Sequence, residues 1–468
     1  MSQVTLPHKR SIDWPIIIIY LSLLIIGWLM LYSTTYDEDS PLSYLDPLSI
    51  MGKQSIWIII SVIAFILVVN IEWNFWNTFS YPLYGLSLAL LVAVLFVGSE
   101  INGAKAWFNL GFFSFQPAEI AKLGTCLALS SYMSFNKYNL NEKRVLFTCL
   151  AIIFVPMILI LLQPDAGSSL VFLSLTIVLY RKGLSGFYFL FAFALIGIFI
   201  LSLMYGAELM AIIALLVAYA ILLFSYEFKP ISIVVYLLTV LAVFYAIFQN
   251  YIFVYWIITG LGILISSYLN YSKRNFRIPI LVIPSAILAI MFAFLTQFVF
   301  DNVLKPHQQE RINVWLRPER CDPRGSLYNI IQSKLAIGSG GITGKGFLKG
   351  EMTMLKFVPE QTTDFIFTTV GEEQGFIGSV SVVILFLILL YRMVVIAERT
   401  RLEFIRNFCY GAAGIFFMHF FVNIGMTVGL MPVIGIPLPF LSKGGSSLLT
   451  FSIIIAMVVK MDALRMRG

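Results

Sequence analysis

The stretch that decides the fold is PIIIIYLSLLIIGWLMLYS, residues 15–33, an apolar run without a single charged residue. A helix of about 20 such residues is long enough to cross the hydrocarbon core of a bilayer. The run is too long for the core of a secretory signal peptide, and it lacks a small-x-small cleavage site. We therefore expect an uncleaved first membrane helix, preceded by Lys9 and Arg10.

Similar apolar runs recur along the whole chain. Its 468 residues are 59% hydrophobic and only 12% charged, whereas soluble domains carry about 25% charged residues. These values exclude a soluble globular protein and predict an all-α polytopic membrane protein. The cysteines show no CxxC spacing, so neither a zinc site nor a disulfide framework is indicated. The net charge of +7 is typical of cytoplasmic loops and does not indicate a nucleic-acid partner.

The apolar runs predict about fourteen membrane helices. With a cytoplasmic N-terminus, most basic residues fall in inner loops, and the short outer loops hold only Lys53, Lys105 and Lys443. The positive-inside rule then places both termini in the cytoplasm. The expected helices are 14–34, 54–71, 80–98, 117–135, 145–163, 168–181, 184–205, 207–225, 230–249, 251–271, 278–301, 370–393, 408–431 and 445–461.

Residues 302–369 form a long polar stretch that is much richer in charge than the remaining chain. A segment of this length between membrane helices is uncommon unless it has a function. The helix count places it on the extracytoplasmic face. We therefore divide the chain into an N-terminal membrane half at 1–205, further membrane helices at 206–301, this loop, and C-terminal membrane helices at 370–468.

Within the loop, Asp322 and Pro323 precede apolar residues spaced for one helix face, and GSGG at 338–341 is a typical helix end. Aspartate at the N-cap with proline in the first turn is a common helix start. The pattern predicts an interfacial helix capped by Asp322, whose carboxylate can still present an oxygen to a substrate. Arg324 and the neighbouring arginines can receive a phosphate or only solvate the loop.

Two charged residues, Glu119 and Lys122, lie three positions apart and hence on one face of an expected membrane helix. Charged side chains at membrane depth are costly and usually face a partner or a cavity. The pair is either mutually satisfied or binds an anion. Asp165, in QPDAG, fits a turn residue as well as a functional one, and Trp107 fits an aromatic of the membrane interface.

The segment GLMPVIGIPLPFLSKGGSS, residues 429–447, is rich in proline and glycine at membrane depth. Irregular backbone there is tolerated only where it packs within protein or lines a cavity. The segment therefore favours a binding cavity. His419, just before it, is more typical of a polar residue packed between helices than of a ligand.

Several segments jointly resemble one family, the SEDS proteins of cell elongation, division and sporulation. In family order they are GAKAWFNLGFFSFQPAEIAKL (103–123), LLQPDAGSS (161–169), RINVWLRPERCDPRGSLYNIIQSKLAIGSGGITGKGF (311–347), FVPEQTTDFIFTTVGEEQGFIG (357–378) and VNIGMTVGLMPVIGIPLPFLSKGGSS (422–447). The resemblance covers about 1–205 and 302–468. QSKLAIGSGGITGKG and VPEQTTDFIF look more like the elongation member than the division member.

The resemblance implies a SEDS-like helical bundle that polymerises lipid II into β-1,4 glycan on the outer face of the cytoplasmic membrane. By motif match, Asp322 is the family's catalytic aspartate, and Glu119 and Lys122 are its charged cavity pair. Trp107, Asp165, Glu360 and Asp364 match other motif positions. The implied partners are a class B penicillin-binding protein, other membrane proteins of the elongation complex, and membrane lipids.

Three features depart from the family pattern. Family members resemble ten-helix proteins, whereas residues 206–301 add about four helices; an even number keeps the Asp322 loop outside. Lys443 stands where the family usually has an aromatic residue. Ala106 replaces an arginine before Trp107, with Lys105 adjacent. Either lysine can serve an anionic substrate.

The implied reaction joins a sugar hydroxyl to an anomeric carbon while a lipid pyrophosphate departs. Asp322 is expected to act as general base on the acceptor 4-hydroxyl, with inversion. The departing diphosphate needs positive charge from Lys122, from the loop arginines, or from a divalent cation such as Mg²⁺ or Mn²⁺. The alternatives are a septal polymerase, a flippase for the lipid-linked precursor, and a non-catalytic scaffold.

Overall fold

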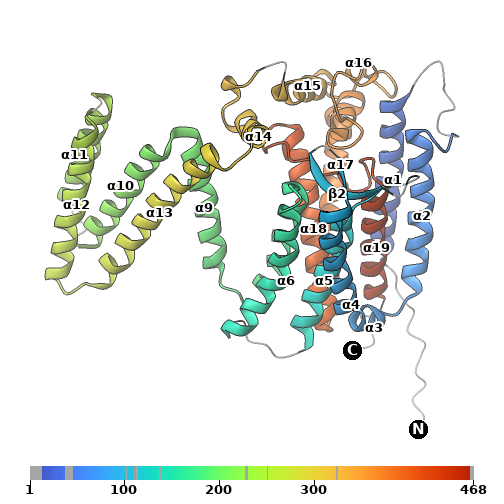
Figure 1. Cartoon of the computed structure of the whole chain (residues 1–468), viewed down its shortest axis with the longest axis horizontal. Coiled ribbons are helices and arrows are strands. Elements are labelled where there is room, and N and C mark those ends of the chain that lie inside the picture. The colour runs from blue at the N-terminus through green and yellow to red at the C-terminus, as the bar shows by residue number, and fades with distance from the viewer. Residues whose placement is uncertain are drawn as a thin grey trace, which may run out of the picture. The chain divides into compact units, whose positions relative to one another are not determined.

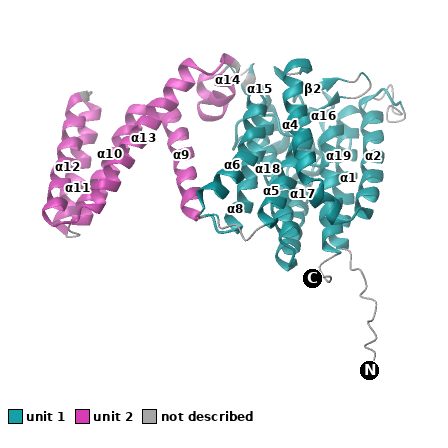
Figure 2. Cartoon of the chain, turned by 60° about the horizontal axis from the view of Figure 1, so that its bottom comes forward, with its two compact units in different colours: residues 1–184, 322–468 teal, residues 185–321 magenta. Residues whose placement is uncertain are grey.

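The computed structural model describes residues 13–36, 46–101, 103–109, 111, 114–135, 140, 142–226, 230–249, 251–322 and 325–463. The chain divides into two compact units (Figure 2). Unit 1 comprises Met1–Leu184 with Asp322–Gly468, and unit 2 comprises Ser185–Cys321. These boundaries differ from the four-part division expected from the sequence, which stays a prediction.

Unit 1 contains the helices on both sides of unit 2 in the chain, together with a small sheet (Figure 1). The helices before unit 2 are α1 (Trp14–Thr35), α2 (Ile50–Asn70), α3 (Trp73–Thr78), α4 (Ser80–Val97), α5 (Pro117–Phe135), α6 (Lys143–Leu161), α7 (Ala166–Phe172), the 3₁₀ turn η2 (Leu173–Leu175) and α8 (Thr176–Arg181). Those after it are α15 (Ser326–Ser339), α16 (Glu351–Met354), α17 (Ile366–Arg399), α18 (Glu403–Thr427) and α19 (Gly445–Asp462).

Side chains define where several of these helices begin. Asp13 is the N-cap of α1, and its carboxylate accepts a hydrogen bond from the amide of Ile16 at 3.4 Å. Ser49 caps α2 in the same way, through the amide of Gly52 at 2.8 Å. Such oxygens satisfy amides that have no partner inside the first turn of a helix. The start of a membrane helix is therefore set by polar residues, and its length by the apolar run that follows.

The centre of unit 1 is formed by α5, α18 and α19, and the other helices pack around them. The membrane-spanning windows of α18 and α19 are each 78% buried, against 22% for α2 and for α4. Helix α5 is buried on nearly every face. A helix enclosed by protein can carry polar side chains that a lipid-facing helix cannot. The polar groups of α5 and α18 therefore point into protein.

Twelve helices in the described part of the chain are long and apolar enough to cross a membrane. The predicted all-α polytopic membrane protein is thereby confirmed. The predicted helix 117–135 forms as α5, but α5 is more polar than these twelve helices and is not one of them. The predicted helix 168–181 forms as α7 and α8 with the 3₁₀ turn η2 between them. The predicted count of fourteen membrane helices is not confirmed.

A small antiparallel sheet, which the sequence analysis did not predict, connects α4 to α5 (Figure 1). Its three strands, in the order β1-β2-β3, are β1 (Ser99–Ile101), β2 (Ala104–Asn109) and β3 (Ser114–Phe115). Gly103, at φ +81°, turns the chain between β1 and β2 with a backbone conformation that other residues adopt at a cost. The sheet ends two residues before Pro117, where α5 begins.

Unit 2 is a separate set of apolar helices with a sparse core. Asn270 donates to the carbonyl of Leu222 at 2.8 Å, and Ser202 donates to that of Ala293 at 3.0 Å. Such interhelical hydrogen bonds hold apolar helices together where lipid removes the hydrophobic driving force. The unit contains α9 (Gly186–Tyr205), α10 (Ala207–Tyr226), α11 (Pro230–Phe248), α12 (Ile252–Ser272), α13 (Arg277–Asn302), α14 (Pro306–Leu316) and the 3₁₀ turn η3 (Pro318–Arg320).

The predicted helix after Asp322 forms as α15 and ends at Ser339, as its glycines indicated. Its N-cap, however, is Gly325, so the prediction that Asp322 caps this helix is wrong. The amide of Gly325 donates to the backbone carbonyl of Asp322 at 3.0 Å. This turn places Asp322 before the helix and leaves its side chain exposed.

Candidate functional site

Two deeply buried charges of unit 1, Lys122 and Glu119, lie on α5, and each is 1% exposed. The Lys122 ammonium lies 2.8 Å from Glu119 Oε1, so the predicted contact between them is confirmed. The same ammonium lies 2.9 Å from Nε2 of His419 on α18, and 5.5 Å from the centre of the Phe451 ring on α19. Three central helices thus meet at one ammonium group.

The segment between α18 and α19 is irregular, as its prolines and glycines predicted. Asn423 donates through Nδ2 to the carbonyls of Ile436 at 2.7 Å and Asp364 at 3.0 Å. His419 approaches the carbonyl of Pro437 with Nδ1 at 3.0 Å. Side chains of α18 therefore satisfy backbone groups that lack helical partners. The segment packs within protein, as the bilayer requires.

The same segment is joined to the chain just before α17. Ser442 donates to the carbonyl of Thr363 at 2.5 Å, and the amide of Lys443 donates to the carbonyl of Thr362 at 2.8 Å. The Asp364 carboxylate lies close to Gly435. If residue 435 were alanine, its Cβ would lie 3.3 Å from Asp364 Oδ2. The predicted site residues Asp364 and Lys443 are thus brought to one region, both half-buried.

Asp165 occupies the turn before α7 and caps that helix through the amide of Ser168 at 2.9 Å. Its other oxygen accepts a hydrogen bond from Gln116 Nε2 at 2.8 Å. Gln116 directly precedes α5, so this bond ties the start of α7 to the helix that carries Lys122. The turn role considered for Asp165 is confirmed, with a second role in holding α5.

The remaining predicted residues are Trp107, Glu360, Asp322 and Arg324. Trp107 is half-buried on β2, and its carbonyl accepts from Ser99 Oγ at 3.0 Å. Glu360 is exposed, has φ +54°, and accepts from Thr363 Oγ1 at 3.1 Å. Asp322 is exposed, and Arg324 lies outside the described residues.

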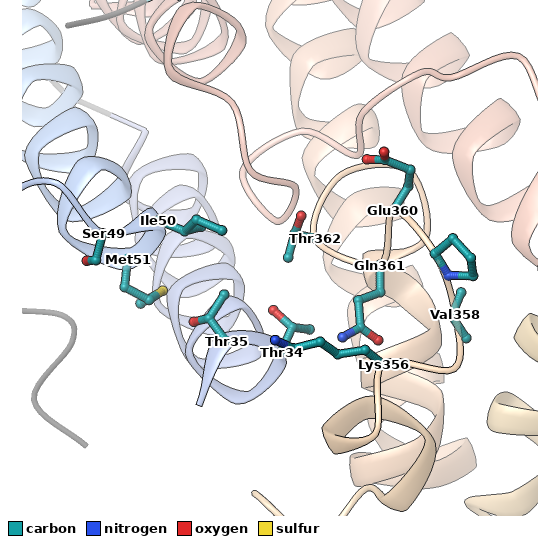
Figure 3. A pocket seen from close by; sticks show the side chains of 11 residues that line it. Thr34, Thr35, Ser49, Ile50, Met51, Lys356, Val358, Glu360, Gln361 and Thr362 are labelled. Carbon is teal, nitrogen blue, oxygen red and sulfur yellow. The ribbon is translucent and has the colours of Figure 1, made fainter. Parts of the chain in front are cut away.

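A pocket of about 390 Å³ opens in unit 1 between the end of α1, the start of α2 and the loop before α17 (Figure 3). Glu360 contributes to its wall and Asp322 does not. Its lining mixes hydroxyl, amide and charged groups with apolar ones: Thr34, Thr35, Ser49, Ile50, Met51, Lys356, Val358, Pro359, Glu360, Gln361 and Thr362.

Another buried carboxylate belongs to Glu372, in the first turns of α17. Its role in binding the preceding loop was not predicted from the sequence. Glu372 is fully buried and accepts hydrogen bonds from Lys345 Nζ at 2.9 Å and from the amides of Met352 and Thr353, both at 2.9 Å. The hydrogen bond to Glu372 raises the pKa of Lys345 above its usual value. Glu372 thereby holds the loop between α15 and α17.

His419, Asn423 and Gln116 were likewise missed as site residues. Each is a buried polar side chain. His419 contacts Lys122, Asn423 contacts the irregular segment, and Gln116 contacts Asp165. Polar residues enclosed in a membrane bundle are the signal that could have found them. Among the described residues, no group of three or more His, Cys, Asp or Glu side chains is arranged to hold a metal ion.

These features define a polytopic membrane protein with an ammonium–carboxylate–imidazole centre enclosed by α5, α18 and α19. Comparison with known proteins identifies its family. A family model described as cell cycle protein, FtsW/RodA/SpoVE, matches residues 14–211 and 207–466. The chain belongs to this family, which confirms the resemblance. The matched ranges also cover residues 206–301. They do not test whether four helices are inserted there, so the insertion stays a prediction.

Individual relatives match over nearly their whole length. The peptidoglycan glycosyltransferase RodA of Treponema pallidum is 30% identical, covering 96% of this chain and 97% of that protein. The peptidoglycan glycosyltransferase MrdB of Escherichia coli is 28% identical, covering 94% of this chain and 90% of that protein. A solved chain from a peptidoglycan synthase complex that coordinates polymerization and crosslinking is 26% identical and superimposes with a TM-score of 0.62, covering 98% and 99% of the two chains.

Proposed function

We propose that this chain is a peptidoglycan glycosyltransferase that polymerises lipid II on the outer face of the cytoplasmic membrane, for cell elongation. The observation that carries this proposal is the match to relatives named as such glycosyltransferases over almost the full length of both chains. The buried Lys122–Glu119 centre supports it, because it sits on the motif segments that carry the resemblance. The RodA match favours elongation over septal synthesis.

The chemistry requires a base and a source of positive charge. Asp322 takes the proton of the acceptor 4-hydroxyl as that oxygen attacks the anomeric carbon of the donor, which gives inversion and a β-1,4 link. Its side chain is exposed and does not cap α15, which supports a role at a sugar hydroxyl. The ammonium of Lys122 contributes positive charge for the departing pyrophosphate. Trp107, Asp165, Arg324, Glu360, Asp364 and Lys443 complete the substrate-binding set that we propose.

The orientation follows from the distribution of charge. Both termini lie in the cytoplasm and the loop that holds Asp322 lies outside, because Lys and Arg gather in the loops that this orientation places inside. A class B penicillin-binding protein supplies the transpeptidase; the similarity to a chain from a polymerizing and crosslinking complex supports this partner. Other membrane proteins of the elongation machinery and the surrounding lipids are further partners.

The proposal is tested with the purified full chain, its penicillin-binding partner and fluorescent lipid II. Asp322→Asn should lower the polymerisation rate by about 10²- to 10⁴-fold, the usual contribution of a general base. Asp301→Asn, a change at another exposed aspartate, is the matched control and should leave the rate unchanged. Full polymerisation by Asp322→Asn would contradict the assigned base. Translocation of lipid II in liposomes without polymer would favour a flippase instead.

A further inference from the structure

We propose that His419 is a positioning residue that orients the Lys122 ammonium by accepting one of its N–H groups at Nε2. The inference rests on the proposed function, since it assigns a role within the same charged centre. It starts from three contacts. Lys122 Nζ lies 2.8 Å from Glu119 Oε1 and 2.9 Å from His419 Nε2, and His419 Nδ1 lies 3.0 Å from the carbonyl oxygen of Pro437.

The carbonyl of Pro437 determines which nitrogen of the ring carries the proton. A carbonyl oxygen can only accept, so Nδ1 of His419 must be the donor in that bond. In a neutral imidazole the other nitrogen is then an acceptor. An ammonium has donors only, so Lys122 donates to Nε2. One tautomer of His419 satisfies both contacts, and the opposite tautomer satisfies neither.

The surroundings of the ring leave no place for a second proton on Nε2. His419 is 1% exposed, and the charged groups at this point are Lys122 and Glu119, which is bound to the same ammonium. The Phe451 ring closes another side, edge to face with a centroid distance of 4.8 Å. A proton on Nε2 would oppose the Lys122 ammonium at 2.9 Å in a buried site. His419 therefore works as a neutral acceptor.

Two anchors fix the direction of the third N–H of Lys122. An ammonium held by Glu119 alone can rotate about its last bond, whereas one held by Glu119 and His419 presents its remaining proton in one direction. In the described part of the chain, Glu119 Oε2 is buried and has no hydrogen-bond partner. The pair thus offers one free acceptor and one oriented donor. A sugar phosphate, with hydroxyl donors and phosphate acceptors, matches this arrangement.

His419 also connects the charged pair to the irregular segment before α19. The carbonyl it contacts belongs to Pro437, next to Ile436, whose carbonyl is held by Asn423. Asn423 in turn holds the backbone of Asp364. Movement of this segment therefore reaches the Lys122 ammonium through one imidazole ring.

The test uses two neutral amide variants that each keep one half of the histidine. In His419→Gln the amide oxygen reaches the position of Nε2 and can accept from Lys122. In His419→Asn the amide reaches only the position of Nδ1 and can serve Pro437. Polymerisation of fluorescent lipid II by the full chain with its partner should be retained largely in His419→Gln and fall about 10- to 100-fold in His419→Asn, because misplaced catalytic groups cost rate on this scale.

A purely structural role predicts a different pattern. Each variant loses one of the two hydrogen bonds, so equal activities, or a more active His419→Asn, would overturn the inference. A wild-type chain that does not polymerise lipid II would contradict the proposed function and not the role of His419. Thermal unfolding of each purified variant in detergent shows whether a loss of rate reflects a loss of fold.

A measurement on the intact site keeps the inference testable if both variants unfold. The chain has only three histidines, His8, His307 and His419. In a ¹⁵N-histidine-labelled chain with His8→Gln and His307→Gln, the remaining ring should show a proton on Nδ1 and a bare Nε2 at neutral pH. A proton on Nε2, with or without one on Nδ1, would overturn the assignment.

Discussion

At the residue scale, the centre of unit 1 is built from polar side chains that hydrogen-bond to one another. Lys122, Glu119 and His419 are each about 1% exposed, yet every ring nitrogen and the ammonium has a partner. Burying a charge costs several kcal/mol unless another charge or a hydrogen bond compensates it. Inside the bundle, the contacts of Lys122 with Glu119 and His419 offset part of this cost.

Variants of the Lys122–Glu119 pair should affect stability and polymerisation activity differently. Lys122→Met leaves the Glu119 carboxylate buried without a counterion, so it should lower the free energy of unfolding by about 3–5 kcal/mol. The double variant Glu119→Gln/Lys122→Met removes both charges and should recover most of that stability. It should not recover polymerisation, because the positive charge for the leaving pyrophosphate is gone. Thermal unfolding in detergent and the lipid II assay measure the two effects; normal polymerisation by the double variant would show that the pair is only structural.

Part of this centre could be predicted from the sequence. Glu119 and Lys122 lie within one helical turn, so their contact follows from local spacing. The partner of Lys122 on α18 lies 297 residues away, and no local pattern indicates that separation. His419 was accordingly interpreted as a packed polar residue, which is correct for its burial but omits its role. Residues far apart in the chain meet through packing, which periodicity does not encode.

At the element scale, the helices were predicted better than their ends and connections. An apolar run long enough to span a bilayer predicts a helix because the bilayer permits little else. The helix expected at 370–393 is α17, which begins at Ile366 and ends at Arg399. Short strands such as β1 and β3 carry too few residues to show an alternating pattern. The cap assigned to Asp322 was wrong because the chain turns once more before α15 begins.

The start of α17 supports a prediction about the loop that precedes it. The Glu372 carboxylate accepts hydrogen bonds from the Lys345 ammonium, from the backbone amides of Met352 and Thr353, and from Thr353 Oγ1 at 2.7 Å. Glu372→Gln removes the charge and turns an amide N–H toward donors, so it should cost about 1.5–3 kcal/mol of stability. It should also expose residues 344–354 to proteolysis.

The neighbouring carboxylate Glu351 provides the matched control. It lies 3.7 Å from the same Lys345 ammonium, but its side chain is 82% exposed. Glu351→Gln should therefore change stability by less than about 1 kcal/mol, as is usual for exposed ion pairs. Thermal unfolding of both variants measures the loss of stability, and limited proteolysis measures the exposure of the loop. Equal effects at Glu351 and Glu372 would show that burial of the Glu372 hydrogen bonds does not hold the loop.

At the scale of the whole chain, unit 1 is closed by contacts between its first and last helices. The similarity to a solved synthase chain over 98% of the sequence indicates that this arrangement belongs to the family fold. At the end of unit 1 where α1 begins, Asp13 binds Arg392 and Arg399 near the end of α17. Arg399 also lies 2.5 Å from Asp462, the last residue of α19. One ion cluster thus joins three helices.

This cluster should make stability depend on pH. Burial alone would raise the pKa of Asp13, but hydrogen bonds from Arg392 and Arg399 outweigh it and hold the pKa below the usual 3.8. Because the folded pKa is the lower one, the contribution is complete well above pH 3.8 and is lost as pH falls through the folded pKa. Asp13→Asn should therefore cost about 2 kcal/mol at neutral pH, and its melting temperature should converge with that of the wild type as the pH is lowered below 3.8. Glu403→Gln, which breaks a half-exposed pair with Lys182, is the control and should cost less than about 1 kcal/mol. A constant difference between wild type and Asp13→Asn across the acid range would show that Asp13 acts only as a neutral helix cap.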